Sequence, residues 1–118
     1  MTTASPVLVV GSGASGLLAS MMMARAGRRV TLLERSDWIG GTSALSGGRI
    51  WLPANGTPEN AGDSIENATR YLTALLPKGS AHAIEAFLQT VPDLLEVLRE
   101  HTALSLVSCE HYPDYHPD

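Results

Sequence analysis

The feature that most constrains this chain is a glycine pattern, G-x-G-x-x-G at residues 11–16, set between two apolar segments of different character. The segment before it, Val7–Val10, is a short apolar run with β-branched side chains, which predicts a strand buried on both faces of a parallel sheet. The segment after it, Leu17–Ala26, is rich in alanine, leucine and methionine, which predicts a helix. A further apolar run, Arg29–Glu34, predicts a second strand. Strand, helix and strand in this order predict a βαβ unit of an α/β fold with a right-handed crossover.

The three glycines have separate physical roles in a turn that binds a dinucleotide. Gly11 permits the tight turn, Gly13 lets the backbone approach a pyrophosphate, and Gly16 permits close packing of the helix. Amides at the helix N-terminus then face the phosphates, and the helix dipole favours their charge. Glu34 follows eighteen residues after Gly16, where its carboxylate can accept hydrogen bonds from both hydroxyls of an adenosine ribose. The same charge repels a 2′-phosphate, so the pattern predicts an adenine dinucleotide other than NADP.

The long segment 35–62 has no helical or strand periodicity but is rich in Gly, Ser, Asn and Pro, which predicts a functional loop. Within it, residues 40–53 hold two glycine pairs interleaved with hydroxyl side chains. Such a loop brings amides and hydroxyls against a planar polar ring without a Cβ in the way. A simple nicotinamide-binding half needs no loop of this kind. The apolar residues 50–52 favour an ordered loop over a solvated linker.

The rest of the chain predicts a helical segment. A helix over 64–76 begins at a capping-box spacing, Asp63 to Glu66. Ser80 is placed to cap a second helix, and Pro92 to start a third. Leu104–Val107 favours a short final strand.

Charge and cysteine content narrow the classes of partner and compartment. Residues 1–52 carry five basic and two acidic side chains, whereas residues 53–118 carry three basic and ten acidic ones, which argues against a nucleic acid partner. The four histidines have no spacing that predicts a metal site. The single cysteine, Cys109, fits a reducing compartment, and no apolar run is long enough to span a membrane. We therefore expect a soluble, cytoplasmic protein.

Five segments of the chain together resemble a known family: 9–16, 33–35, 40–48, 50–53 and 112–115. They are similar to the N-terminus of the FAD-dependent fumarate reductase and 3-oxosteroid 1-dehydrogenase superfamily, and the last two are closest to its steroid branch. The resemblance implies an incomplete Rossmann-like FAD-binding domain over residues 1–62. It implies a helical segment leading into a substrate domain over residues 63–118.

The resemblance also implies which residues contact FAD. The glycine turn would hold the pyrophosphate, Glu34 the adenosine ribose, and Arg35 would lie beside the adenine. Residues 41–43 would meet the phosphates and the ribityl chain, and residues 46–48 would lie close to the isoalloxazine. The expected cofactor-binding residues are Gly11, Ser12, Gly13, Ala14, Ser15, Gly16, Glu34, Arg35, Gly40, Gly41, Thr42, Ser43, Ser46, Gly47 and Gly48.

The activity implied by the resemblance is removal of hydrogens from ring A of a 3-oxosteroid, a small-molecule substrate, with the external electron acceptor left open. Tyr115 matches a tyrosine that assists abstraction of a ring hydrogen as the flavin accepts a hydride. Other catalytic residues would lie outside these 118 residues, so we expect the isolated chain to be inactive. Two alternatives remain at this point. One is a fumarate reductase-like flavoprotein with another substrate, and the other is a non-catalytic module that binds an adenine dinucleotide.

Overall fold

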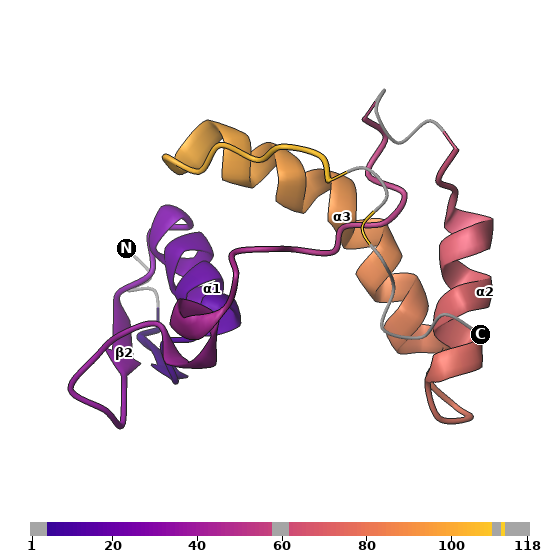
Figure 1. Ribbon diagram of the computed structural model, residues 1–118. Coiled ribbons are helices and arrows are strands. Elements are labelled where there is room, and N and C mark those ends of the chain that lie inside the picture. Colours follow the sequence, from indigo (N-terminus) through magenta and orange to yellow (C-terminus); the bar gives the residue numbers. More distant parts are fainter. Residues whose placement is uncertain (1–4, 58–61, 110–111, 113–118) are drawn as a thin grey trace. The chain divides into compact units, whose positions relative to one another are not determined.

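A computed structural model describes residues 5–57, 62–109 and 112 (Figure 1). The chain divides into two compact units, one up to Ile50 and one from Trp51 onward. Among the described residues, the first unit holds two strands, one α-helix and one 3₁₀-helix, and the second holds two α-helices. In chain order the elements are β1 (Val7–Val10), α1 (Ala14–Arg25), β2 (Val30–Leu33), η1 (Gly41–Leu45), α2 (Ile65–Leu75) and α3 (Ala81–His101).

The first unit is the predicted βαβ unit. Strands β1 and β2 pair in parallel, from Val7 opposite Val30 to Val10 opposite Leu33. Helix α1 joins them and packs on both strands (Figure 1). The prediction of an α/β fold with a Rossmann-like start is therefore confirmed.

Helix α1 begins earlier than the sequence indicates. Its first residue is Ala14, and extended Gly13 is its N-cap, so the second half of the glycine pattern forms the first helical turn. The predicted start at Leu17 is wrong. Glycine lowers helix propensity, but the first turn of this helix requires glycine for close packing, so the helix includes Gly16.

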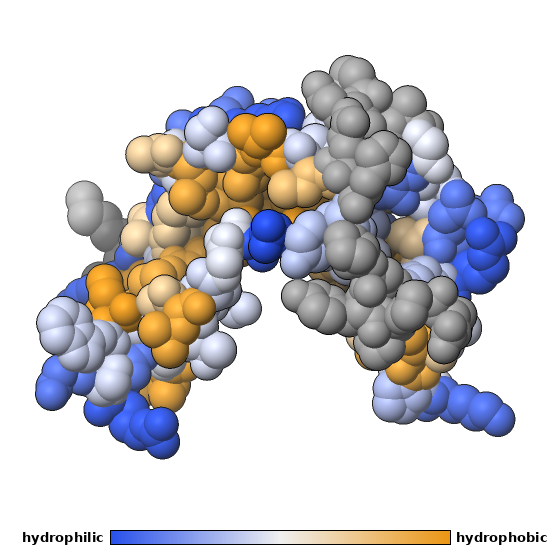
Figure 2. All heavy atoms as spheres, viewed as in Figure 1, coloured by the Kyte–Doolittle hydropathy of each residue, from blue (hydrophilic) through white to orange (hydrophobic). Residues whose placement is uncertain are grey.

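The two strands are not buried on both faces, as their apolar sequence predicts. Half-buried and exposed residues alternate along each strand, and Leu8 and Val10 are 61% and 79% exposed. In the described part of the first unit, α1 is the only α-helix, and it packs on both strands, so this unit itself provides no second layer for the other face of the sheet. Apolar side chains on the molecular surface are visible in Figure 2.

In the second unit, α2 and α3 pack through a small apolar core. Ala68, Ile84 and Leu88 are almost fully buried, and Leu72 packs against them. Trp51 lies edge-on to Tyr71, with 5.6 Å between ring centroids, and stacks on Phe87 at 6.0 Å. The apolar end of the loop is therefore held against these helices.

The capping of α2 and α3 differs from the predicted pattern. The Ser64 hydroxyl accepts a hydrogen bond from the amide of Asn67, 3.1 Å away, and so caps α2. The carboxylate of Asp63 instead accepts from the amide of Ala54. Ser80 precedes α3, but its hydroxyl donates to the carbonyl of Pro77 rather than capping the helix. Several hydroxyl and carboxyl groups near a helix start compete for the same amides, so sequence alone does not select among them.

Two further predictions for this unit are wrong. Helix α3 runs unbroken from Ala81 to His101 with Pro92 inside it, where the sequence predicts two helices. Proline removes one helical hydrogen bond and bends the axis, and Figure 1 shows α3 changing direction along its length. The helix continues because its buried stripe extends on both sides of the proline, through Leu88, Val91, Leu95 and Leu98. Residues 104–107 form no strand, because β1 and β2 pair only with each other in the described residues.

Candidate functional site: the glycine turn and its neighbours

The glycine turn needs glycine at two positions for two different reasons. Gly11 has φ +96°, in the region that side chains disfavour, and its amide donates to the carbonyl of Leu33 at 2.7 Å. A Cβ on Gly16 would lie 1.9 Å from the carbonyl oxygen of Gly11. At Gly13 the backbone is ordinary, and a Cβ would come no closer than 3.8 Å to the chain. No contact within the described chain therefore requires glycine at this position. A ligand that approaches the backbone at Gly13 would require it.

Amide donors gather where α1 begins. In the described part of the chain, the amides of Gly13, Ser15 and Gly16 donate no hydrogen bond. The amide of Ala14 donates to the hydroxyl oxygen of Ser43 at 3.1 Å. Free first-turn amides and the positive end of the helix dipole form an anion-binding site. The turn therefore fits a pyrophosphate.

The second glycine-rich segment packs directly on this turn. Gly40 has φ +112°, and a Cβ there would lie 2.7 Å from the Cβ of Ala44. A Cβ on Gly41 would lie 3.5 Å from the Cα and the nitrogen of Gly13. Together with the bond from Ala14 to Ser43, these contacts bring residues 40–43 against the start of α1. Two segments that the sequence predicts to contact one cofactor thus lie side by side.

Glu34 follows β2 and is held by two serines. Its Oε2 accepts from the amide and the hydroxyl of Ser12, at 2.9 and 2.5 Å. Its Oε1 accepts from the amide of Ser36 at 2.9 Å, with the hydroxyl of that serine 3.2 Å away. These donors, the Ser12 hydroxyl first among them, lower the pKa of Glu34 to about 2. The carboxylate beside the glycine turn is therefore ionised and fixed in direction.

Ser12 has a role that its place in the glycine pattern does not indicate. Its side chain is fully buried. Its hydroxyl donates to Glu34 and accepts from the amide of Gly40 at 2.9 Å. Ser36 is not among the residues predicted from the sequence, although a serine two residues after a carboxylate is a recognisable signal for a local turn in which the side chains bond nearby amides.

The remaining residues predicted to bind FAD or to act in catalysis take no part in the bonds among Ser12, Glu34 and Gly40. Arg35 and Thr42 are exposed. Ser46–Gly48 is an exposed turn closed by its own bonds, with the Ser46 hydroxyl accepting from the amide of Gly48. No hydrogen bond in the described part of the chain joins this turn to the glycine turn. Tyr115 lies outside the described residues.

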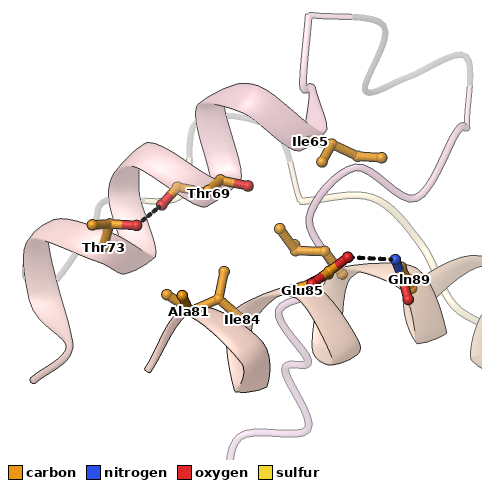
Figure 3. Close-up of a pocket in the computed structure, with 8 residues that line it drawn as sticks. Ile65, Thr69, Thr73, Ala81, Ile84, Glu85 and Gln89 are labelled. Carbon is orange, nitrogen blue, oxygen red and sulfur yellow. Dashed lines mark hydrogen bonds between the residues drawn. The ribbon is translucent and has the colours of Figure 1, made fainter. Parts of the chain in front are cut away.

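The second unit contains a pocket of a different kind. It has a volume of about 330 Å³ and lies between α2 and α3 (Figure 3). Its lining is mainly apolar, with the Gln89 amide donating to the Glu85 carboxylate and the Thr73 hydroxyl donating to the carbonyl of Thr69. None of the residues predicted to bind cofactor or to act in catalysis lines it: the lining is Ile65, Thr69, Thr73, Ala81, Ile84, Glu85, Leu88 and Gln89. The candidate cofactor site therefore lies in the first unit.

The residues that the structure describes hold no cluster of three or more His, Cys, Asp or Glu side chains arranged to bind a metal ion. None of the helices in residues 5–57 and 62–109 has the length and apolar character needed to cross a membrane.

The fold and the site together define a βαβ unit that binds a dinucleotide. Comparison with protein families then identifies the dinucleotide, because residues 6–114 match the family described as the FAD binding domain. The chain belongs to this family, and its cofactor is FAD, as predicted from the resemblance.

Individual relatives agree with this family. The chain is 40% identical to a 4-oxocyclohex-2-ene-1-carboxylate 5-dehydrogenase of Sinomonas cyclohexanicum, over 99% of this chain and 20% of the relative. It is 38% identical to a 3-oxosteroid 1-dehydrogenase of Rhodococcus opacus, over 98% of this chain and 23% of that one. A crystal structure of 3-ketosteroid delta1-dehydrogenase from Sterolibacterium denitrificans in complex with 1,4-androstadiene-3,17-dione matches with a TM-score of 0.71 and 37% identity. That match covers 83% of this chain and 18% of the crystallised one. The chain thus spans about one fifth of the length of these relatives.

One prediction concerns the charge of Glu34. A carboxylate whose pKa is lowered on folding stabilises the folded state above its unfolded pKa, and loses that contribution as the pH falls through the folded value. We expect the difference in unfolding free energy between the wild type and Glu34→Gln to be constant above about pH 5 and to shrink between the ordinary value of 4.5 and about 2. Urea unfolding at a series of pH values measures this difference, and a difference that stays constant down to pH 2.5 would contradict it.

Proposed function

We propose that Gly11, residues 13–16, Glu34 and residues 40–43 hold the ADP part of FAD. The observation that carries this proposal is the set of free amides at Gly13, Ser15 and Gly16, with an ionised carboxylate fixed nearby. The amides bind the pyrophosphate, and Glu34 accepts from a ribose hydroxyl. Residues 40–43 close over the turn through Gly41 and Ser43. Arg35, exposed beside Glu34, lies next to the adenine, and Ser46–Gly48 faces the isoalloxazine.

For the whole protein we propose dehydrogenation of a carbon–carbon bond in the ring of a cyclic ketone, with a 3-oxosteroid as the substrate class. The support is that the relatives at 37–40% identity are named as dehydrogenases of oxosteroids or oxocyclohexene carboxylates. When bound, FAD supplies the acceptor for a hydride. Tyr115, as the phenolate, would take the proton from the neighbouring ring carbon and become a neutral phenol. A cytoplasmic location also stays a prediction.

A second substrate class has its own support. The identity of 40% to a 4-oxocyclohex-2-ene-1-carboxylate dehydrogenase favours a single-ring oxo acid as an alternative to the fused steroid ring. Both substrates present a carbon–carbon bond close to a ring carbonyl. They differ in size and in the carboxylate, so the part of the protein that binds substrate distinguishes them.

An assay of the whole protein that carries this segment tests the proposal. The purified protein is incubated with a 3-oxosteroid, 4-oxocyclohexanecarboxylate or succinate, each with an artificial electron acceptor. We expect reduction of the acceptor with the steroid. Turnover of 4-oxocyclohexanecarboxylate alone would make a single-ring oxo acid the substrate class in place of the 3-oxosteroid. Turnover of succinate alone would favour a fumarate reductase-like flavoprotein. Heat-denatured protein that releases no flavin would overturn the FAD proposal itself.

The variant Gly13→Ala tests where the pyrophosphate lies. The backbone at Gly13 suits alanine, and the added Cβ stays 3.8 Å from the Ser43 hydroxyl, so we expect the unfolding temperature to remain close to that of the wild type. FAD affinity should fall, because overpacking of a filled site costs about 1–3 kcal/mol. Flavin fluorescence titration measures the affinity. Unchanged FAD affinity in a folded variant would place the pyrophosphate elsewhere.

A further inference from the structure

Ser12 is the only polar residue in the described part of the chain that is buried as a whole, and it joins two segments of the candidate cofactor site. Its hydroxyl has one proton to donate, and that proton goes to Oε2 of Glu34 at 2.5 Å. The hydroxyl oxygen of Ser12 accepts from the amide of Gly40 at 2.9 Å. With its side chain fully buried and its hydroxyl bonded on both sides, Ser12 is not available to contact FAD directly.

The bonds to Glu34 divide its two oxygens into different roles. Each carboxylate oxygen has two lone pairs, and those of Oε2 are filled by the amide and the hydroxyl of Ser12. Oε1 accepts from the amide of Ser36. The Ser36 hydroxyl has one proton for two acceptors, Oε1 at 3.2 Å and the carbonyl of Trp38 at 2.6 Å, and the shorter distance favours the carbonyl. Oε1 therefore keeps one acceptor site for a ligand.

We propose that Ser12 is a positioning residue that presents Oε1 of Glu34 to the adenosine ribose and ties this carboxylate to the loop at Gly40. This inference rests on the proposed binding of FAD at the glycine turn. Its physical content is that Ser12 fixes Oε2, so that the ribose hydroxyl is recognised through Oε1. Without the Ser12 hydroxyl, Oε2 keeps only one of its two donors, the backbone amide of residue 12, so the carboxylate is held less firmly in direction. The amide of Gly40 also loses its acceptor.

The test uses two ligands that differ only in the groups that Glu34 recognises. The flavin-free whole protein is titrated with FAD and with an FAD analogue built on 2′,3′-dideoxyadenosine. We expect Ser12→Ala to weaken FAD affinity by about tenfold, the size of effect known for hydrogen bonds to charged groups, and to weaken affinity for the analogue by less than about twofold. An equal loss for both ligands would show a merely structural role and overturn the inference.

A double-mutant cycle with Glu34→Ala gives an independent readout. If Ser12 acts through Glu34, Ser12→Ala should cost much less FAD affinity when Glu34 is already alanine. Additive losses would overturn the inference. Ser12→Cys keeps most of the buried volume but donates weakly, so it provides the same comparison of ligands if Ser12→Ala does not fold.

The matched control is Ser20→Ala in α1. The hydroxyl of Ser20 is buried and has no hydrogen-bond partner in the described residues, so its removal should leave the affinity for both ligands unchanged. The design also separates this inference from the function on which it rests. Equal wild-type affinity for FAD and the dideoxy analogue would remove the ribose contact of Glu34, and with it the inference, whereas equal losses on Ser12→Ala would remove only the role of Ser12.

Discussion

Replacement of Gly16 by alanine should strongly weaken FAD binding and destabilise the first unit. The new Cβ would lie 1.9 Å from the carbonyl oxygen of Gly11 and 3.0 Å from its carbonyl carbon. Both atoms belong to the backbone, which cannot rotate away as a flexible side chain can. The turn would have to open, and this overpacking should cost about 3 kcal/mol or more. Because each 1.4 kcal/mol is a factor of ten, FAD affinity should fall by about 100-fold or more when measured by flavin fluorescence.

The control for Gly16→Ala is Gly62→Ala. Gly62 is exposed, and a Cβ added there meets no atom within 4 Å. This variant should bind FAD as the wild type does and unfold at a similar temperature. If Gly16→Ala kept wild-type affinity, the turn would tolerate rearrangement, and the close contact between Gly16 and Gly11 would not be needed for binding.

Leu88→Ala should produce the largest loss of stability in the second unit. Leu88 is 3% exposed and packs with Ala68 and Ile84 between α2 and α3. Truncation of a buried leucine costs about 2–5 kcal/mol, because the lost apolar contact is accompanied by a cavity. Urea unfolding should show a lower midpoint, and the bonds among Ser12, Glu34 and Gly40 in the other unit are not affected directly.

A leucine in the same pair of helices provides the comparison for Leu88→Ala. Leu75 ends α2 and is 41% exposed, so Leu75→Ala removes the same atoms from a site that water already reaches. Its cost should be well below that of Leu88→Ala. Equal costs at the two positions would mean that the packing of α2 on α3 contributes little to the stability of this unit.

Much of the first unit could be predicted because its signals are local. The apolar run before the glycine pattern, the helix after it and the second strand lie next to one another in the sequence, and each has a characteristic pattern. The roles of Gly11 and Gly16 also follow from their spacing, since a turn from strand to helix requires a positive φ first and a close approach later. These two predictions are confirmed by the structure.

The predictions that are wrong depend on packing that a local pattern does not contain. Pro92 signals a break, but the buried stripe of α3 on both sides of it outweighs one lost hydrogen bond. The apolar residues 104–107 resemble a strand, but they have no strand to pair with in the described part of the chain. The exposure of Leu8 and Val10 has the same origin, because burial on both faces requires layers from beyond the two strands.

The residues of the candidate site could be predicted from the sequence, but the hydrogen bonds that join them could not. Spacing identifies Glu34 as the carboxylate after the second strand, but the bond from Ser12 spans 22 residues and the bond from Gly40 to Ser12 spans 28. Such bonds form only when the chain brings three segments together. A serine in the variable second position of a glycine pattern gives no sequence signal for this role.

The short crossover between β1 and β2 has a consequence for the order in which the protein forms. Every described group proposed to hold the ADP part of the cofactor lies between residues 11 and 43, and the strands that align them are joined by one helix. Contacts between residues close in sequence form quickly, and a growing chain folds from its N-terminal side. During synthesis, residues 11–43, which form the proposed site for the ADP part of FAD, can therefore fold soon after residue 43 leaves the ribosome.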